Sequence, residues 1–385
     1  MKRVVKNKEN NAQMREDESS CYIPQDLIEE ILANLPTKSV VKLIVVSKLW
    51  SSIIRSKYFI DLYLKRSVTR PCFLFTFHHG NGRFFHSISQ EAAPSCSSTS
   101  SFPLSLDTPP LLLGYNVCTP VRGLICSQDL DKLVISNPST GQFLVLPNLE
   151  TKRRRVSFFG YDPIEDDYKV LCMTVLQVPS NSGPVVSEEH QVFTLGGAQK
   201  KKAATWRTIA CKLPHFPATK GLCFNGVVYY GAWSNSDRKG SLIVAFNVRL
   251  EDFTLVKLPI GVEIHKSRDS ELVNYQRKVA LANHSYKGKF ELWVLEDVDN
   301  QEWSKMSVVV PSWNDLVGRS LFYCRGAISS GEFIFTPSLS DGSFFIIISY
   351  GSKEEIVRRV GIEGIGDGSN YVRSFLDYVE CPIFL

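Results

Sequence analysis

The pattern of apolar and polar positions divides the chain into two unlike parts. Within residues 23–54 the apolar side chains recur at helical spacing, first at Leu27, Ile28, Ile31, Leu32 and Leu35. Beyond residue 70, short runs of alternating apolar and polar residues are typical of β-strands. The pattern therefore predicts a small helical unit followed by a much larger, mainly β part.

Two prolines and two hydroxyl residues give the helical unit its expected boundaries. Pro24 suits the first turn of a helix, because its missing N–H needs no partner there. Pro36 disfavours helical geometry at Leu35 and so ends the first helix. Thr37 or Ser39 can cap a second helix by accepting a hydrogen bond from a first-turn N–H group. Ser47 offers another break or cap before a third short helix, so three helices are expected.

The helical unit carries more apolar surface than three short helices can bury among themselves. At about 25 cal/mol per Å² of apolar surface, leaving a few such side chains in water forgoes several kcal/mol. A surplus of this kind marks a binding surface. The alternative is that the helices pack against the downstream domain, and the pattern leaves both interpretations open.

An ordered set of residues in this unit matches a known motif: Ile23-Pro24-x-Asp26-Leu27, Ile31-Leu32-x-x-Leu35-Pro36-x-Lys38-Ser39 and Val46-Ser47-Lys48-x-Trp50. On these residues, the region 21–66 resembles the F-box of plant F-box proteins. The resemblance implies three helices that dock on the Skp-type adaptor of an SCF (Skp–cullin–F-box) ubiquitin ligase. The adaptor-contact residues that it implies are Pro24, Leu27, Ile31, Leu32, Leu35, Pro36, Val40 and Val41. Trp50 and Ile53 are expected to hold the helices together.

Charge is concentrated near the start of the chain. Residues 1–70 hold 13 Lys or Arg against 8 Asp or Glu, whereas the remaining residues balance to zero. A neutral β part lacks the basic stripe that a nucleic-acid backbone requires, so no nucleic acid is expected as a partner. We expect residues 1–20, which are polar and basic, to be disordered.

The sequence favours an intracellular protein. Apolar runs such as Phe344 to Ile348 are far shorter than the ~20 residues of a membrane span, and the start of the chain lacks the apolar core of a signal peptide. The ten cysteines are irregularly spaced and include no Cys-x-x-Cys, which favours reduced thiols. We expect no membrane contact and a cytoplasmic or nuclear location. A basic run at 152–155 is either a nuclear-import patch or, more simply, a solvated loop.

The β part shows signs of a repeat. Residues 137–147 and 246–259 each read as strand, turn, strand and a Leu-Pro exit. A unit of roughly 40–50 residues suits four-stranded propeller blades, and about 300 residues give six or seven of them. The Ser-rich stretch 94–101 is expected to be a loop, so 67–110 is interpreted as connecting strands and a loop at the start of the β part, followed by a propeller-like domain at 111–385. A pair of β-sandwiches is the alternative architecture.

Motifs along this part match a second family. They are Arg122-Gly123-Leu124, Asn137-Pro138-Ser139-Thr140-Gly141, Gly160-Tyr161-Asp162-Pro163, Thr205-Trp206-Arg207, Asn225-Gly226-Val227, Leu292-Trp293 and Glu302-Trp303. On these motifs the β part resembles the plant F-box-associated domain, which implies a kelch-like, β-propeller-like interaction domain. The tryptophans are interpreted as packing residues, with ligand stacking as the alternative. What varies within that family is the substrate, so the substrate-binding residues stay unknown.

A search for catalytic chemistry finds no motif. The sequence has no Gly-x-Ser-x-Gly elbow, no His-Glu-x-x-His and no phosphate-binding loop of the Walker type. His78-His79 has no Cys or carboxylate at ligand spacing, and Glu188-Glu189-His190 is interpreted as a solvated loop. No catalytic residue, metal or cofactor is therefore expected.

Two classes of function remain. The preferred one is a non-catalytic substrate receptor, in which the F-box binds the Skp-type adaptor and, through it, the cullin and RING subunits, while the β part binds an unknown protein for ubiquitination and degradation. Its candidate contact loops are 236–240, 265–271 and 314–319. The alternative is a propeller-type enzyme or small-ligand binder whose helical segment is only a cap.

Overall fold

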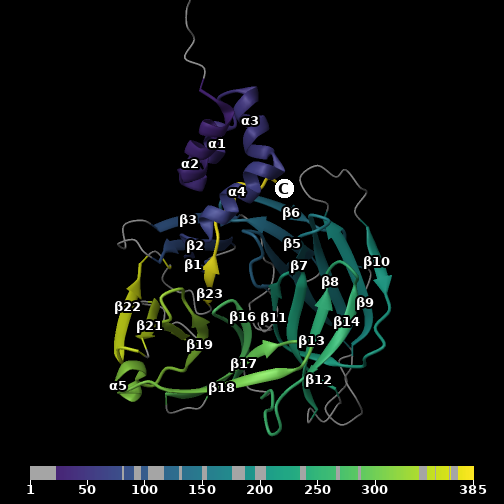
Figure 1. Cartoon of the computed structure of the whole chain (residues 1–385), viewed down its shortest axis with the longest axis vertical. Helices are drawn as coiled ribbons and strands as arrows, with labels where there is room; N and C mark the ends of the chain where they lie inside the picture. Colours follow the sequence, from purple (N-terminus) through teal and green to yellow (C-terminus); the bar gives the residue numbers. More distant parts are fainter. Residues whose placement is uncertain are drawn as a thin grey trace, which may run out of the picture.

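A computed structural model of the chain shows four N-terminal helices joined to a ring of β-sheets (Figure 1). The structure describes residues 23–79, 82–90, 97–102, 117–129, 132–149, 154–175, 187–195, 205–234, 240–265, 269–284, 288–337, 345–351, 353–363, 365 and 372–385. Within these residues six antiparallel sheets form a β-propeller, so the expected propeller is confirmed and has six blades.

The helices begin and end close to where the prolines and serines predict. They are α1 (Gln25–Asn34), α2 (Thr37–Leu43), α3 (Lys48–Arg55) and α4 (Lys57–Ser67). Pro36 occupies the N-cap of α2, so the expected capping by Thr37 or Ser39 was wrong. The Ser47 side chain accepts a hydrogen bond of 3.1 Å from the Trp50 N–H and begins α3 in this way.

A fourth helix, α4, was not predicted from the sequence. Ser56 begins it by accepting a 3.1 Å hydrogen bond from the Phe59 N–H. The Tyr63 hydroxyl donates to the Leu35 carbonyl at 2.9 Å and lies 2.8 Å from the Thr37 hydroxyl. Tyr63 thus holds α4 against the corner between α1 and α2. Among the described residues, no helix has the length and apolar character to cross a membrane.

Each blade is one antiparallel sheet, and in every blade except blade 1 the strands follow one another in the chain. Blade 1 contains β23 (Arg373–Tyr378), β1 (Cys72–His79), β2 (Gly82–Ser89) and β3 (Ser97–Phe102). Blade 2 contains β4 (Ile125–Asp129), β5 (Lys132–Asn137) and β6 (Gln142–Val145). Blade 3 contains β7 (Arg154–Asp162), β8 (Asp167–Val175), β9 (Ser187–Leu195) and β10 (Trp206–Ile209).

The other three blades each have four strands. Blade 4 contains β11 (Phe216–Phe224), β12 (Val227–Trp233), β13 (Ser241–Asn247) and β14 (Asp252–Lys257). Blade 5 contains β15 (Ser270–Tyr275), β16 (Lys278–His284), β17 (Lys289–Asp297) and β18 (Glu302–Val309). Blade 6 contains β19 (Phe322–Ala327), β20 (Phe333–Pro337), β21 (Phe345–Gly351) and β22 (Ile356–Ile362), and the short helix α5 (Trp313–Val317) precedes it.

Blade 1 closes the ring, because it joins the two ends of the propeller sequence. Its inner strand β23 pairs with β1, from Cys72 opposite Tyr378 to Thr76 opposite Arg373. Residues 97–102 form β3 and pair with β2, so the prediction of a loop over the whole Ser-rich stretch was wrong. The segment interpreted as a connection therefore supplies three strands of the closing blade.

The hydrophobic core is divided into clusters that lie between neighbouring blades. Phe158 of blade 3 stacks on Tyr230 of blade 4 with ring centroids 4.2 Å apart, and Phe290 of blade 5 meets Phe335 of blade 6 edge-on at 5.3 Å. Comparable clusters fill the other interfaces around the ring. Apolar side chains thus join the blades into one ring.

Two tryptophans repeat the same contact between blades. The Trp206 indole N–H on β10 donates to the Pro147 carbonyl at 2.8 Å, and the Trp303 indole N–H on β18 donates to the Lys257 carbonyl at 3.0 Å. In both cases the outermost strand of one blade is tied to the exit of the preceding blade. The interpretation of these two residues as packing residues is confirmed.

For two short polar segments, the prediction of a solvated loop was wrong. Arg154 and Arg155 begin β7, and the Arg155 side chain is buried, so this part of the basic run is not a solvated loop. His190 lies buried on β9 rather than in a solvated loop. Both segments pair with neighbouring strands.

Candidate functional site

The helices present an exposed apolar face above a small core of their own. Large apolar side chains on this face are exposed at Ile23, Leu27, Ile31, Val45, Val46 and Leu49. Beneath it, Leu32, Ala33, Val40, Ile53, Ile54, Phe59 and Tyr63 form a buried cluster. The helical unit has therefore filled its own core and still leaves apolar surface in water, which is the property of a docking surface.

The eight residues implied as adaptor contacts differ in how much of each side chain is exposed to solvent. Leu27 and Ile31, one turn apart on α1, are each 54% exposed, and Pro24 and Pro36 are also exposed. Leu35 and Val41 are half-buried. Leu32 and Val40 are 1% and 0% exposed, so in this structure they support the face from beneath rather than form it.

The residues expected to hold the helices together lie in or against the buried cluster. Ile53 belongs to it, and Trp50 packs on it while half-buried. Four exposed side chains of the face were not among the implied contacts: Ile23, just before α1, and Val45, Val46 and Leu49, between the end of α2 and the first turn of α3. The continuous apolar run before Ser47 was the sequence signal for Val45 and Val46.

Helix α4 provides the packing of the helical unit on the propeller. Its Ile60 and Leu64 side chains enter the cluster between blades 2 and 3. The sequence left open whether the apolar surplus docks a partner or packs on the downstream domain. Because α4 provides this packing, the apolar face of α1 to α3 stays exposed to solvent.

Polar contacts join α4 to the propeller beside these apolar ones. Arg122, in the turn before β4, donates from its guanidinium to the Asp61 carboxylate of α4 at 2.5 Å, and it lies 4.3 Å from the centre of the Tyr161 ring. Lys57 pairs with Asp166 at 3.1 Å. These contacts fix the helical unit relative to blades 2 and 3.

The C-terminal segment also lies at this junction. The Asn137 side-chain amide, fully buried, donates to the Cys381 and Ile383 carbonyls at 2.9 and 2.8 Å. The Arg55 guanidinium of α3 lies 4.3 Å from the centre of the Phe384 ring. Figure 1 shows the helices beside the rim of the ring at blades 1 and 2, away from its centre.

The centre of the ring holds a cavity of about 230 Å³. Its walls come from the inner strands β11, β15, β19 and β23 and from Thr119 and Pro120, which precede β4. Blades 4, 5, 6 and 1 thus contribute residues to it through these inner strands.

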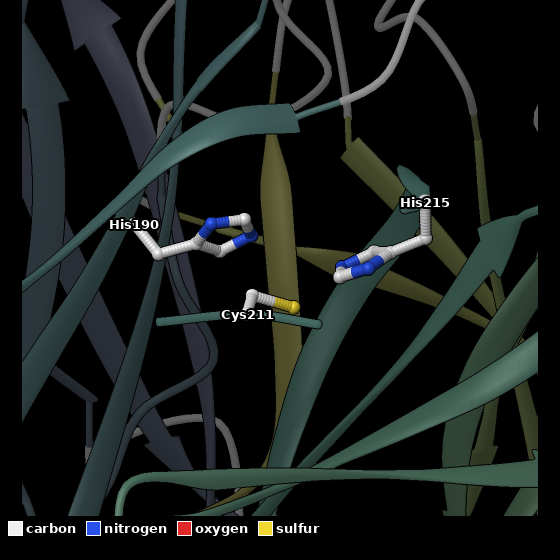
Figure 2. A group of neighbouring side chains, drawn as sticks. All are labelled: His190, Cys211 and His215. Atoms are coloured by element: carbon white, nitrogen blue, oxygen red, sulfur yellow. The ribbon is translucent and has the colours of Figure 1, made fainter. Parts of the chain in front are cut away.

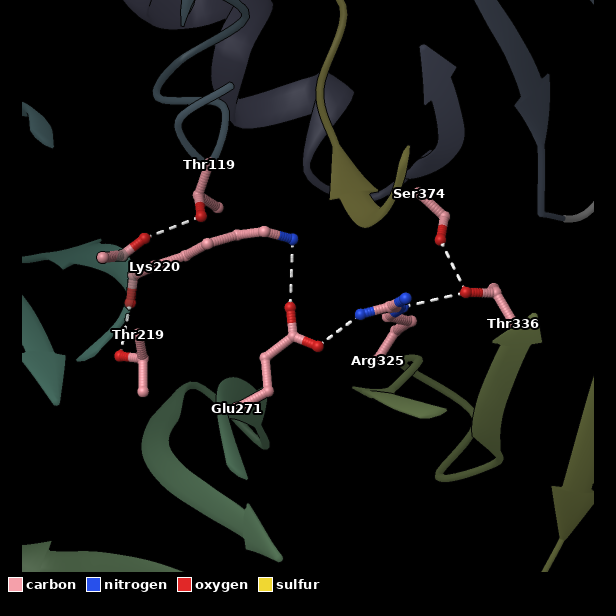
Figure 3. Close-up of polar contacts among 8 residues, drawn as sticks. Thr119, Thr219, Lys220, Glu271, Arg325, Thr336 and Ser374 are labelled. Carbon is pink, nitrogen blue, oxygen red and sulfur yellow. Dashed lines mark hydrogen bonds and ion pairs between the residues drawn. The ribbon is translucent and has the colours of Figure 1, made fainter. Parts of the chain in front are cut away.

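A charged cluster lies in this cavity (Figure 3). Glu271 on β15 accepts from Lys220 on β11 at 3.1 Å and from Arg325 on β19. Arg325 also donates from Nε to the Thr336 hydroxyl at 2.8 Å, and the Ser374 hydroxyl of β23 donates to the same oxygen at 3.0 Å. The cluster therefore links the inner strands of blades 4, 5, 6 and 1.

Burial and mutual attraction set the pKa values in this cluster. Desolvation lowers the pKa of Lys220 to about 8, although Glu271 opposes the change. Desolvation alone would raise the pKa of Glu271, but Arg325 and Lys220 outweigh it and lower that pKa far below its usual range. Lys220, Arg325 and Glu271 are therefore charged near pH 7, and Asp377, whose pKa burial raises, also lines the cavity.

The three loops proposed as substrate contacts are only partly within the described residues. Residues 236–239 and 266–268 lie outside them. Glu271, taken as the end of the second loop, is instead part of strand β15 and faces the central cavity. Residues 314–317 belong to helix α5.

Two protein-family models match the chain, one after the other. The F-box domain model matches residues 21–62, which include α1 to α3 and the first part of α4. The model of the F-box associated beta propeller domain matches residues 72–379, which run from the start of β1 to one residue past β23. Residues 63–71, which lie between the two matches, contain the rest of α4 and the connection to β1.

The chain is also similar to curated proteins along almost its whole length and, more distantly, to solved structures. Among solved structures, the Aleuria aurantia lectin in complex with alpha-methyl-L-fucoside has a TM-score of 0.43 and 8% identity, with 79% of this chain and 98% of that chain covered. F-box protein At1g30790 of Arabidopsis thaliana is 37% identical, with 94% of this chain and 96% of the relative covered. F-box/kelch-repeat protein At3g04660 of the same plant is 39% identical, with 100% of this chain and 98% of the relative covered. The chain belongs to the family of plant F-box proteins in which the F-box is followed by an F-box-associated β-propeller.

Proposed function

We propose that this protein is the substrate receptor of an SCF ubiquitin ligase. One observation supports the proposal above all: α1 to α3 keep an exposed apolar face although their own core is filled and α4 provides the packing on the propeller. The partner of this face is a Skp-type adaptor, which in turn carries the cullin and RING subunits. A location in the cytoplasm or nucleus, where such ligases act, is part of the proposal.

The protein forms no covalent bond in this mechanism. It holds a substrate on the propeller and the ligase on the helices, and so raises the effective concentration of substrate lysines near the ubiquitin-loaded enzyme. Because Ile60, Leu64 and the Asp61–Arg122 pair fix α4 on the ring, the two binding surfaces keep a constant separation. A flexible junction would lower that effective concentration.

The central cavity is the proposed contact for the substrate. None of its lining residues belongs to the helices α1 to α4, so an adaptor and a substrate can bind at the same time. Its charged residues Lys220, Glu271 and Arg325 offer donors and an acceptor to a polar side chain of a protein. The substrate itself is a protein whose identity must come from experiment.

Adaptor capture tests the docking half of the proposal. We expect Leu27→Asp with Ile31→Asp to reduce capture of a purified Skp-type adaptor at least ~10-fold, since two charges then face an apolar partner. The matched control is Leu250→Asp, because Leu250 is also exposed but lies in a turn of blade 4. Equal capture by both variants and the wild type would contradict the proposal.

A substrate trap tests the receptor half. A chain that carries Leu27→Asp and Ile31→Asp keeps its propeller but no longer delivers substrates, so its bound proteins should accumulate. We expect these proteins to be stabilised in cells and to be lost from a second trap with Glu271→Gln added in the cavity. Bound proteins whose lifetime does not depend on the wild-type chain would contradict a role in degradation.

A further inference from the structure

Between blades 3 and 4, two histidines and a cysteine come together away from both binding surfaces. His190 lies on β9, whereas Cys211 and His215 lie in the segment that connects β10 to β11. One candidate ligand atom from each residue lies within 4.8 Å of the other two. Figure 2 shows the two imidazole rings facing the Cys211 sulfur from opposite sides. Within the part of the chain that the structure describes, no second group of three His, Cys, Asp or Glu side chains is spaced closely enough to hold a metal ion.

The surroundings make this group different from exposed histidines. His190 and His215 are buried, and Cys211 is half-buried. The Phe253 ring lies 5.3 Å from the His190 ring and 6.2 Å from the His215 ring, between centroids. Burial and aromatic packing thus hold the two imidazole rings close to the Cys211 sulfur.

Hydrogen bonds already orient two of the three side chains. The Leu213 carbonyl lies 2.6 Å from His215 Nδ1 and 3.4 Å from the Cys211 sulfur, and it can only accept, so both groups donate to it. His215 Nε2 then accepts from the Tyr230 hydroxyl at 2.8 Å. A histidine whose ring N–H is held by a backbone carbonyl is the usual arrangement around a bound metal.

We propose that His190, Cys211 and His215 bind one Zn²⁺ ion. A thiolate and two imidazoles are the ligands of a borderline-soft divalent cation, and zinc accepts them in a tetrahedral arrangement. With Zn–S about 2.3 Å and Zn–N about 2.0–2.1 Å, the ligand atoms draw together by roughly 1 Å, and His215 exchanges one of its two hydrogen bonds for the metal. Cys211 loses its thiol proton to solvent, and a water molecule takes the fourth position.

The ion would connect blade 3 to blade 4. It would tie the third strand of blade 3 to the connecting segment that enters blade 4, and among the described strands these two blades are separate sheets. Metal bound to the folded state and not to the unfolded chain stabilises the fold in proportion to the logarithm of its free concentration. The proposed site is independent of adaptor and substrate binding.

Cobalt titration of the full chain tests the site. Metal is first removed with a chelator, and Co²⁺ is then added while the near-ultraviolet absorption that marks a thiolate-to-cobalt bond is recorded. We expect one Co²⁺ per chain, displaced by Zn²⁺, with that absorption lost in Cys211→Ser and kept in the control Cys223→Ser, another half-buried thiol. We expect His190→Gln to weaken Zn²⁺ binding at least ~10-fold. No saturable uptake, or equal uptake by Cys211→Ser, would overturn the proposal.

A measurement on the wild-type chain keeps the test decisive if a variant does not fold. Zn²⁺ should slow alkylation of Cys211 by iodoacetamide at least ~10-fold, because a ligated thiolate is not free to react, and should leave the rate at Cys223 unchanged. Mass spectrometry of the two peptides reports both rates in one sample. An unchanged rate at Cys211 with Zn²⁺ present would overturn the proposal as well.

Discussion

The Arg122 guanidinium donates a 2.5 Å hydrogen bond to the Asp61 carboxylate and thereby joins the propeller to helix α4. The same guanidinium lies over the Tyr161 ring of blade 3, with 4.3 Å to the ring centre. One side chain thus contacts the helical unit and two blades. This position gives the Arg-Gly motif before β4 a physical role: it sets the orientation of the F-box on the ring.

Arg122→Ala should loosen the junction. Loss of a charge-assisted hydrogen bond and a cation–π contact costs about 1–3 kcal/mol in the free energy of unfolding. Arg122→Lys should recover only part of this, because an ammonium lacks the planar guanidinium that stacks on Tyr161. Chemical denaturation measures the loss, and hydrogen exchange should show faster exchange in α4.

A more exposed ion pair at the same junction serves as the control. Lys57, whose side chain is 48% exposed, pairs with Asp166, and Lys57→Ala should change stability by less than about 1 kcal/mol. If Arg122→Ala and Lys57→Ala have equally small effects, then Arg122 does not hold the helical unit in place.

Substitutions of Leu27 and Leu32 should have different effects, one on adaptor binding and the other on the stability of the fold. Leu32→Ala removes a buried side chain from the core of the helices and should cost about 2–5 kcal/mol, because a cavity remains. Leu27→Ala should leave the melting temperature nearly unchanged, since that side chain is already in water, and should weaken adaptor capture. Calorimetry and a binding assay on the two purified variants test this. A large loss of stability for Leu27→Ala would contradict the assignment of Leu27 to the exposed face.

Two glycines in turns allow a matched comparison. Gly123 has φ of +83°, and an added Cβ would lie 2.6 Å from the Cys381 Cβ. Gly141 has φ of +73° but no atom within 4 Å of an added Cβ. Gly141→Ala should therefore cost only the backbone strain, about 1 kcal/mol, and Gly123→Ala should cost at least about 2 kcal/mol more. Equal losses in thermal unfolding would show that the C-terminal segment does not press against this turn.

The sequence predicted the elements whose signals are local. Pro36 and Ser47 mark helix boundaries by their own chemistry, and the six-or-seven-bladed propeller followed from a repeated strand–turn–strand unit. The number of blades could not follow from spacing, because blade 1 takes β23 from one end of the sequence and β1 to β3 from the other. A blade assembled in this way has no single interval along the chain.

Residues whose role depends on distant partners were not predictable from the sequence. Asn137 reads as a turn residue, and it does accept from the Ser139 N–H at 2.9 Å, but its amide also binds the C-terminal segment. His190 follows two glutamates and reads as solvated, yet the strand direction buries it beside His215. Leu27 and Leu32 share one apolar stripe, and only the position of α4 decides which of them is covered.

The free energy of unfolding at acid pH should depend on the charge of the Glu271 carboxylate. Its folded-state pKa lies below the value of 4.5 expected in the unfolded chain, so its contribution is fully present above pH 4.5 and is lost as the pH falls through the folded-state pKa. Glu271→Gln leaves Lys220 and Arg325 without their carboxylate and should cost about 3–5 kcal/mol at pH 7. The difference in unfolding free energy between variant and wild type should therefore narrow below pH 4.5.

The other groups around Glu271 determine how this experiment is read. Arg373 keeps its charge throughout the range, whereas desolvation lowers the pKa of His284 to about 4, so His284 gains a proton in the same range in both proteins. Comparing Glu271→Gln with the wild type removes most of that shared contribution. Glu296→Gln is the control, since the Glu296 pair with Lys278 is exposed and should change stability by less than about 1 kcal/mol at any pH. A Glu271→Gln deficit that stays constant from pH 7 to pH 3 would mean that the carboxylate charge is not what holds the inner strands together.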